Sequence, residues 1–218
     1  MRAEGKDTAM YRYFIFDFDG TVANSGALVE KILGELAADS RAKMISAKDF
    51  KHREGLGVLK KLRMFFFIRR ISGTFREKYT RNLPSIPPFA GMLELLVAVH
   101  EAGFPLVFIT SNTEGNIRQF FRIHRFSPAV TVLSSEGLFG KHKAIRRFLK
   151  QYGCAKEDVL YIGDEIRDIK ACRKAGIDMA FVEWGLDGDE DLGGLRPKYR
   201  VKSPTRLRDI LMKTGYSD

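Results

Sequence analysis

The sequence predicts an α/β fold, in which a Rossmann-like parallel sheet forms the core and a small helical domain is inserted after the first strand. Two features lead to this prediction. From about residue 87 onward, short apolar runs alternate with helical segments of about 10 to 13 residues, which is the pattern of βαβ units. Before that region, about 60 residues with helical periodicity and many Lys and Arg separate the first apolar run from the next.

The first strand is expected at residues 11–17, a nearly continuous run of aromatic and β-branched residues of the kind that is buried on both faces of a sheet. A helical insert follows it. Apolar residues recur at helical spacing over 26–38, and the segment 56–71 is basic with an apolar stripe. A proline cluster at 83–88 ends the insert, because proline and the residue before it are disfavoured inside a helix.

The core then continues in regular alternation. Strands are expected at 105–110, 130–133, 159–162 and 179–183, and helices at 91–102, 114–124, 141–152, 165–175 and 205–212. We therefore assign residues 1–22 and 87–218 to the core domain and residues 23–86 to the inserted domain. Because ligands bind at the carboxyl ends of the strands in such sheets, we expect the functional residues there.

The composition indicates a globular protein without a membrane span. Of the 218 residues, 44% are hydrophobic and 29% are charged, which is a normal balance for a folded domain. No apolar run approaches the roughly 18 residues of a membrane-spanning helix, and the N-terminal segment lacks the apolar region of a secretory signal. The two cysteines form no C-x-x-C pair, so neither a disulfide framework nor a zinc site is expected. We expect a cytoplasmic protein.

The excess of positive charge is concentrated in the inserted domain. The whole chain has 37 Lys and Arg against 27 Asp and Glu, a formal charge of +10. Residues 24–86 hold 14 Lys and Arg against 6 Asp and Glu, which accounts for +8 of this charge. Excess basic charge is typical of proteins with an anionic partner, such as a nucleic acid, a membrane surface or a phosphorylated substrate. We expect a small phosphorylated substrate and no membrane partner. The candidates for substrate contacts within the inserted domain are Arg53, Lys60, Arg63 and Arg69.

Two pairs of carboxylates lie where predicted strands end. Asp17 and Asp19 are two residues apart in an extended segment, so both side chains can face one ligand. Asp164 and Asp168 are four residues apart at the start of a helix and share one of its faces. Four carboxylates at one sheet edge repel one another unless a cation lies among them, and oxygen ligands favour a hard ion such as Mg²⁺. Taken singly, each pair is also compatible with a turn or a helix cap.

Ser111, Asn112 and Lys141 supply the donors that a phosphoryl group needs. Ser111 and Asn112 follow the strand at 105–110, and Lys141 begins the helix at 141–152. A hydroxyl, an amide and an ammonium group suit a dianionic group better than a neutral one. The first two residues are also compatible with a helix cap, and capping and phosphate binding can coincide at a helix N-terminus. Together with the carboxylates, these residues predict metal-assisted phosphoryl transfer.

These residues resemble the four motifs of the haloacid dehalogenase superfamily. The segment Asp17-Phe18-Asp19-Gly20-Thr21 is similar to the first motif, Ser111-Asn112 to the second, Lys141 to the third and Gly163-Asp164-Glu165-Ile166-Arg167-Asp168 to the fourth. They occur in the family's order, and the helical insert lies where the family has its cap domain. The segment 87–91 is similar to the one that re-enters the core in phosphoglycolate-phosphatase-like members. Trp184-Gly185 also resembles a recurring pair in related phosphatases, which we interpret as packing at the sheet edge.

The resemblance implies a Mg²⁺-dependent phosphatase that hydrolyses a small phosphorylated metabolite through an aspartyl-phosphate. Asp17 would be the nucleophile, and Asp19 would act as general acid and then as general base. Asp17, Asp164 and the backbone carbonyl of Asp19 would hold Mg²⁺, with Asp168 supporting the metal. The presence of Asp19 argues against dehalogenation, because dehalogenases of the family lack a carboxylate at that place.

Three residues would bind the phosphoryl oxygens by the same resemblance, namely Ser111, Asn112 and Lys141. Lys143 is the alternative to Lys141, because the family's lysine is often followed by proline and here it is followed by His142. A phosphomutase is the alternative within the family, since it shares the nucleophile and the acid and base. A nucleic-acid-binding protein that uses the basic insert is the alternative from another class, although the insert has no recognisable nucleic-acid motif.

Overall fold

The computed structural model describes residues 10–39, 72–135, 140–188 and 192–216. The chain divides into two compact units. The core unit comprises Met1–Asn24 and Pro88–Asp218, and the inserted unit comprises Ser25–Pro87. The inserted unit therefore interrupts the core unit soon after the first strand.

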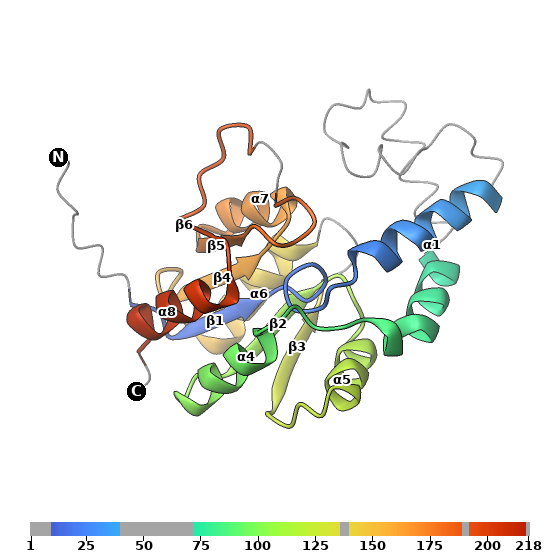
Figure 1. The fold of residues 1–218 in the computed structure, drawn as a ribbon. Helices are drawn as coiled ribbons and strands as arrows, with labels where there is room; N and C mark the ends of the chain where they lie inside the picture. Colours follow the sequence, from blue (N-terminus) through green and yellow to red (C-terminus); the bar gives the residue numbers. More distant parts are fainter. Residues whose placement is uncertain (1–9, 40–71, 136–139, 189–191, 217–218) are drawn as a thin grey trace. The chain divides into compact units, whose positions relative to one another are not determined.

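The core unit is built on a six-stranded parallel sheet, which confirms the predicted fold class (Figure 1). The spatial order of the strands is β3, β2, β1, β4, β5, β6, and every neighbouring pair is parallel. Their bounds are β1 Tyr13–Phe16, β2 Leu106–Thr110, β3 Val130–Ser134, β4 Val159–Gly163, β5 Asp178–Val182 and β6 Tyr199–Val201. The sequence did not predict β6, because three residues centred on Arg200 are too few to show a strand pattern.

Helices cover both faces of this sheet (Figure 1). In the core unit they are α4 Met92–Glu101, α5 Glu114–Ile123, α6 Lys141–Tyr152, α7 Ile166–Ala175 and α8 Pro204–Thr214. The side chains of Thr113 and Ser203 cap the N-termini of α5 and α8, and Gly153 and Gly176 end α6 and α7 in the left-handed conformation. Within the described parts of the chain, no helix combines the length and the apolar character needed to cross a membrane.

Successive residues of the central strand β1 enter two different hydrophobic layers, because strand side chains alternate between the faces of a sheet. Ile15 belongs to the layer that α6 and α7 cover, and α6 and α7 also pack against each other. Phe14 points to the other layer, where its ring lies 4.8 Å from that of Phe104. The ring of Phe16 lies 5.9 Å from that of Phe108. Side chains of β1 therefore pack into a hydrophobic layer on each face of the sheet, which fixes the carboxyl end of this strand.

In the inserted unit, two described helices each bury apolar residues, and an ion pair joins them. The elements are α1 Gly26–Asp39, a helix at 72–82 and the 3₁₀ turn η2 Leu83–Ser85. Ile32 of α1 and Tyr79 of the second helix are buried. Lys78 Nζ lies 2.5 Å from Glu35 Oε2, in a partly exposed pair of the kind that adds at most about 1 kcal/mol to stability.

Part of the predicted basic surface lies outside the described residues. This applies to the helix expected at 56–71 and to the candidate substrate contacts Arg53, Lys60, Arg63 and Arg69. The proline cluster expected to end the insert contains η2, and the residue that follows η2, Ile86, is extended.

The strand order changes direction at β1. The chain passes from β1 to β2 and β3 on one side, and afterwards to β4, β5 and β6 on the other. In parallel sheets a crevice for ligands forms at the carboxyl ends of the strands around such a point. The residues that follow β1, β2 and β4 are therefore the ones to consider as a site.

Candidate active site

Asp17 directly follows β1 and is fixed by backbone contacts. It is 2% exposed, and its Oδ1 accepts the backbone N–H of Phe18 at 2.8 Å. Its own backbone N–H donates to the carbonyl of Ile162 on β4 at 2.8 Å. The Phe18 ring packs edge-on against Phe120 of α5, with centroids 5.0 Å apart. The aromatic residue between the two aspartates, Phe18, is therefore a core residue.

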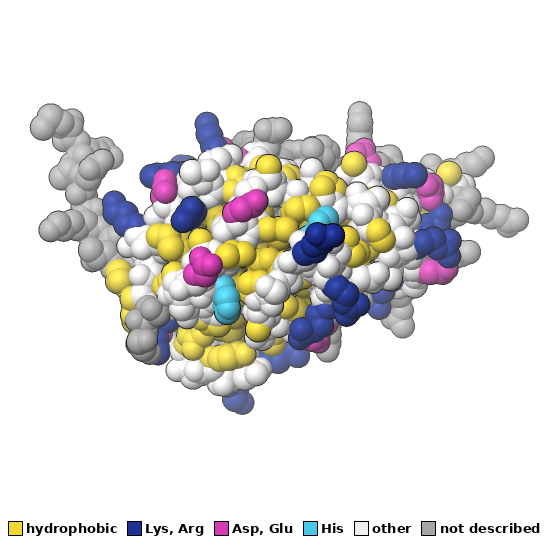
Figure 2. Space-filling model, turned by 60° about the horizontal axis from the view of Figure 1, so that its bottom comes forward, with side chains coloured by type: hydrophobic (Ala, Val, Ile, Leu, Met, Phe, Trp, Pro, Cys, Tyr) yellow, Lys and Arg dark blue, Asp and Glu magenta, His cyan; other side chains and the backbone are white. Residues whose placement is uncertain are grey.

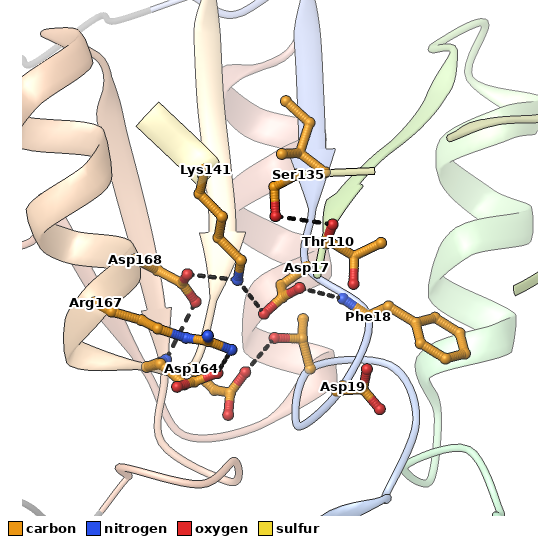
Figure 3. Close-up of polar contacts among 12 residues, drawn as sticks. Asp17, Phe18, Asp19, Thr110, Ser135, Lys141, Asp164, Arg167 and Asp168 are labelled. Atoms are coloured by element: carbon orange, nitrogen blue, oxygen red, sulfur yellow. Dashed lines mark hydrogen bonds and ion pairs between the residues drawn. The ribbon is translucent and has the colours of Figure 1, made fainter. Parts of the chain in front are cut away.

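Asp19 is half-buried and lies beside Asn112. Asn112 Nδ2 donates to Asp19 Oδ2 at 2.9 Å. Gly20, which follows, has a φ of 78°, a left-handed conformation that glycine adopts with little cost and that lets the chain turn sharply here. Figure 3 shows the carboxylate of Asp19 apart from that of Asp17, so the two groups are placed for separate roles.

Asp164 follows β4 and is completely buried. Its Oδ1 accepts the Thr21 hydroxyl at 2.8 Å, and its Oδ2 accepts the backbone N–H of Leu186 at 2.7 Å. Gly20 approaches it so closely that a Cβ at that position would stand 2.1 Å from Asp164 Oδ2. The segments predicted as the first and fourth motifs are thus in direct contact.

Lys141, the first residue of α6, links these segments electrostatically. It is 3% exposed, and its Nζ lies 2.5 Å from Asp17 Oδ2 and 2.5 Å from Asp168 Oδ1 (Figure 3). Burial alone would lower the pKa of Lys141, but Asp168 and Asp17 outweigh it and hold the pKa above its ordinary value. Lys143 is exposed. Of the two lysines considered from the sequence, the structure brings Lys141 to Asp17.

Ser111 and Asn112 follow β2 and are half-buried. Asn112 Oδ1 accepts the backbone N–H of Thr113 and the Nδ2 of Asn116, each at 2.8 Å. The Asn112 side chain is therefore fixed at the start of α5 while its Nδ2 reaches Asp19. The N-cap of α5 is Thr113, which leaves Ser111 in the turn between the strand and the helix.

Asp17, Asp164 and Asp168 form a buried acidic cluster. One carboxylate oxygen of each lies within 4.8 Å of the other two, and each residue is at most 2% exposed. Burial raises the pKa of Asp17, although Lys141 opposes it, and burial also raises the pKa of Asp164. Burial raises the pKa of Asp168 to about 7. On the face shown in Figure 2, by contrast, acidic side chains lie singly at the surface. The cluster needs further positive charge if all three groups are to be ionised together.

The fourth motif contains a second ion pair that was not predicted from the sequence. Glu165 is 4% exposed and pairs with the guanidinium of Arg167, whose side chain is 19% exposed. Burial would lower the pKa of Arg167, but Glu165, Asp168 and Asp17 raise it above its ordinary value. The one signal in the sequence was the pair of opposite charges inside the motif. A sequence pattern does not tell whether such charges face solvent or the site.

The buried ionisable groups of the site carry more negative than positive charge, and a divalent cation would balance the difference. The acidic groups that are at most 4% exposed are Asp17, Asp164, Glu165 and Asp168, and the cationic groups paired with them are Lys141 and Arg167. With all of these groups ionised, the formal sum is −2. Clustered carboxylate oxygens are the ligands that Mg²⁺ prefers. The residues present therefore fit this ion.

Mg²⁺ is expected to raise the melting temperature of the metal-free protein, because it neutralises the acidic cluster in the folded state only. A ligand at 100 times its Kd adds about 2.7 kcal/mol to the free energy of unfolding. Because burial raises the pKa of Asp168 to about 7, this carboxylate is mostly protonated at about pH 5.5 and mostly ionised at about pH 8. The metal binds ionised carboxylates, so the increase in melting temperature should be larger at the higher pH. Thermal unfolding after EDTA treatment measures both effects. NaCl at equal ionic strength is the control, and equal effects of the two salts would contradict the prediction.

Comparison with known proteins places the chain among hydrolases. Residues 14–182 match the family described as "Haloacid dehalogenase-like hydrolase". A phosphoglycolate phosphatase of Synechococcus elongatus is 26% identical over 205 residues, which cover 88% of this chain and 93% of that protein. The pyrophosphatase PpaX of Halalkalibacterium halodurans is 22% identical over 149 residues, covering 66% and 69% of the two chains. The structure of a haloacid dehalogenase-like hydrolase, SP0104 of Streptococcus pneumoniae, superimposes with a TM-score of 0.72 at 21% identity, covering 94% of this chain and 99% of that one.

Proposed function

The chain belongs to the haloacid dehalogenase-like hydrolase family and is a phosphatase, and from this premise we propose that it hydrolyses a small phosphorylated metabolite with Mg²⁺ through an aspartyl-phosphate on Asp17. One observation carries the proposal. The buried ammonium of Lys141 holds Asp17 and Asp168 beside Asp164, at 2.5 Å from each of the first two. Burying these charged groups away from water lowers the stability of the fold. Buried clusters of this kind are typical of catalytic sites, and phosphoryl transfer needs both the carboxylates and the ammonium group.

In the first step an oxygen of the Asp17 carboxylate attacks phosphorus, and the bond between phosphorus and the leaving oxygen breaks. The backbone N–H of Phe18 and the Nζ of Lys141 orient the carboxylate, one on each oxygen. Asp19, as a carboxylic acid, gives its proton to the leaving oxygen. The products are the alcohol and an aspartyl-phosphate.

In the second step Asp19, now a carboxylate, takes a proton from a water molecule, and the resulting hydroxide oxygen attacks phosphorus. The bond between phosphorus and Asp17 breaks, which releases inorganic phosphate and restores the Asp17 carboxylate. Asn112 Nδ2 donates to Asp19 Oδ2 at 2.9 Å and so fixes the orientation of the carboxylate that acts as the base. Asp19 is half-buried, so it is accessible both to a leaving group and to water.

Two further sets of residues complete the proposed site. The proposed contacts of the phosphoryl oxygens are Ser111, Asn112 and Lys141. The proposed ligands of Mg²⁺ are Asp17, Asp164 and the backbone carbonyl of Asp19, with Asp168 in support. The bound cation supplies charge neutralisation between a dianionic phosphoryl group and the acidic cluster. Lys141 contributes a second positive charge from the protein itself.

We assign the choice of substrate to residues 23–86 as a helical cap, on a core of residues 1–22 and 87–218. Two observations support the division. The boundaries between the two compact units lie after Asn24 and before Pro88, and the first boundary closely follows the first motif. The relatives reported above are named for different phosphate compounds, phosphoglycolate and pyrophosphate, so membership of the family does not by itself identify the substrate. Phosphomutase activity and nucleic-acid binding through the basic insert stay predictions from the sequence.

Asp19→Asn is expected to lower the turnover of an alkyl phosphate by about 10²- to 10³-fold, because the amide can neither give nor take the proton. The variant keeps an oxygen that can accept the hydrogen bond from Asn112. With an aryl phosphate, whose leaving group needs no proton, the first step should stay fast and the second should become limiting. A burst of phenolate in rapid-mixing kinetics would show this. Wild-type turnover of the alkyl substrate would contradict the assignment of Asp19.

The proposed function is tested by measuring phosphate release from sugar phosphates, phosphoglycolate, nucleotides and pyrophosphate. We expect release from at least one of these compounds with Mg²⁺, loss of release in EDTA and recovery when Mg²⁺ is added back. A folded protein that releases no phosphate from any of them with Mg²⁺ would contradict the proposal. Isomerisation of a sugar phosphate without release would instead identify a phosphomutase.

A further inference from the structure

The loop that follows β5 contacts both the first motif and the fourth motif. Trp184 donates its indole N–H to the backbone carbonyl of Thr21 at 3.1 Å. Leu186 donates its backbone N–H to Asp164 Oδ2 at 2.7 Å. Asp187 is buried, and its Oδ2 accepts the backbone N–H of Ile166, the first residue of α7, at 2.9 Å. Residues 184–187, named here the β5 loop, thus connect the first motif, the fourth motif and the helix that carries Asp168.

Gly185 lies in van der Waals contact with Asp164. A Cβ at Gly185 would stand 2.1 Å from Asp164 Cβ and 2.4 Å from its Oδ2, distances that real side chains do not show. Gly185 does not adopt a left-handed conformation, so the close approach alone requires glycine here. Because the contacting Cβ is fixed to the backbone at the end of β4, rotation of the Asp164 side chain cannot relieve the clash. Any larger residue must move the carboxylate or the loop.

The base of the β5 loop is held from three sides. Glu183 donates its backbone N–H to the carbonyl of Val201 on β6 at 2.9 Å, and its side chain pairs with Arg200 at 2.7 Å. The ring of Trp184 packs edge-on against Phe89, with centroids 6.4 Å apart. The short strand β6 therefore fixes the place from which the loop approaches Asp164.

We propose that the β5 loop is a positioning element that sets the orientation of the Asp164 carboxylate and, through it, the affinity of the site for a divalent cation. The inference rests on the proposed function, because it takes Asp164 as a metal ligand. Thr21 and Leu186 each donate one hydrogen bond to a different oxygen of Asp164, which leaves a lone pair on each oxygen for a metal. Groups that hold a metal ligand in this way typically contribute 10- to 100-fold to affinity, on the order of the effect expected here.

The test is the affinity of Gly185→Ala for Mn²⁺, measured from the electron paramagnetic resonance signal of the unbound ion. The variant is expected to bind Mn²⁺ about 10- to 100-fold more weakly than the wild type. Gly34→Ala is the matched control, because a Cβ at Gly34 in α1 would meet no atom of the described residues within 4 Å. That variant should bind Mn²⁺ like the wild type. Trp184 is the chain's single tryptophan, so its emission during the titration gives a second readout at the loop itself.

Trp184→Phe is a milder second variant. It keeps a six-membered ring for Phe89 but removes the pyrrole part of the indole, and with it the N–H that the Thr21 carbonyl accepts. No atom is added beside Asp164, so we expect a smaller loss of Mn²⁺ affinity in the same direction. Circular dichroism identifies an unfolded variant, and if Gly185→Ala does not fold, Trp184→Phe decides the question.

Two results separate the failure of this inference from the failure of the proposed function. If the wild type binds Mn²⁺ and releases phosphate while both variants bind within about twofold of it, on the order of the error of such a titration, the role of the loop is wrong and the phosphatase remains. If the wild type binds no Mn²⁺ and releases no phosphate, the proposed function is wrong, and the role of the loop with it.

Discussion

Asp17→Asn is expected to lower phosphatase activity by about 10⁴-fold or more, because the amide cannot attack phosphorus and the covalent route is lost. The change should not damage the fold. The amide has one acceptor oxygen, so it can accept either the Phe18 N–H or the Lys141 ammonium, and Lys141 keeps Asp168 as a partner. The variant also removes one charge from a cluster in which burial raises the pKa of Asp17 and so disfavours its ionised form. Because this gain offsets the lost hydrogen bond, we expect the metal-free variant to remain folded.

Steady-state kinetics and thermal unfolding together check this prediction. Asp209→Asn is the matched control, because Asp209 lies exposed on α8 and its substitution should change neither quantity. If Asp17→Asn kept activity within about tenfold of the wild type, the nucleophile would have to be another group, since losing a nucleophile costs far more than that.

Lys141→Met is expected to reduce both activity and stability. Removing one partner of a buried ion pair costs about 3 to 5 kcal/mol, because the carboxylates of Asp17 and Asp168 then lack their common counter-charge. The metal-free variant should melt well below the wild type. Because its site is more negative, Mg²⁺ should raise its melting temperature more than that of the wild type.

Lys143→Met is the control for this prediction, since Lys143 lies two residues further along the same helix and is exposed. It should leave both the activity and the melting temperature unchanged. The opposite result, a stable and active Lys141→Met with an inactive Lys143→Met, would assign the phosphate-binding lysine to Lys143.

The parallel fold could be predicted from the sequence because its signals are local and repeated. Each buried strand is a short apolar run, and each helix has an amphipathic period, so the alternation predicts the βαβ units. The exception is β6, which is held by its pairing with β5 and by the ion pair of Arg200 with Glu183. Those contacts join residues far apart in the chain, and three residues show no periodicity of their own.

The gathering of Asp17, Asp164, Asp168 and Lys141 could also be predicted, because each occupies the end of a strand or the start of a helix at one sheet edge. The β5 loop could not. Leu186 acts through its backbone N–H, which every residue except proline has, and Gly185 acts through the absence of a side chain. The interpretation of Trp184 as a packing residue agrees with its contact to Phe89 but missed the hydrogen bond to Thr21.

The most direct test of the central claim is to trap the phosphorylated aspartate. Asp19→Asn is mixed with an aryl phosphate and Mg²⁺, quenched in acid during the burst and reduced with borohydride, which converts an aspartyl-phosphate into homoserine. Peptide mass spectrometry then locates the modified residue. Homoserine at position 17, absent when the aryl phosphate is omitted, is the expected result. Phosphate release without homoserine at position 17, or with homoserine at Asp164 or Asp168 instead, would contradict the assignment of Asp17 as the nucleophile.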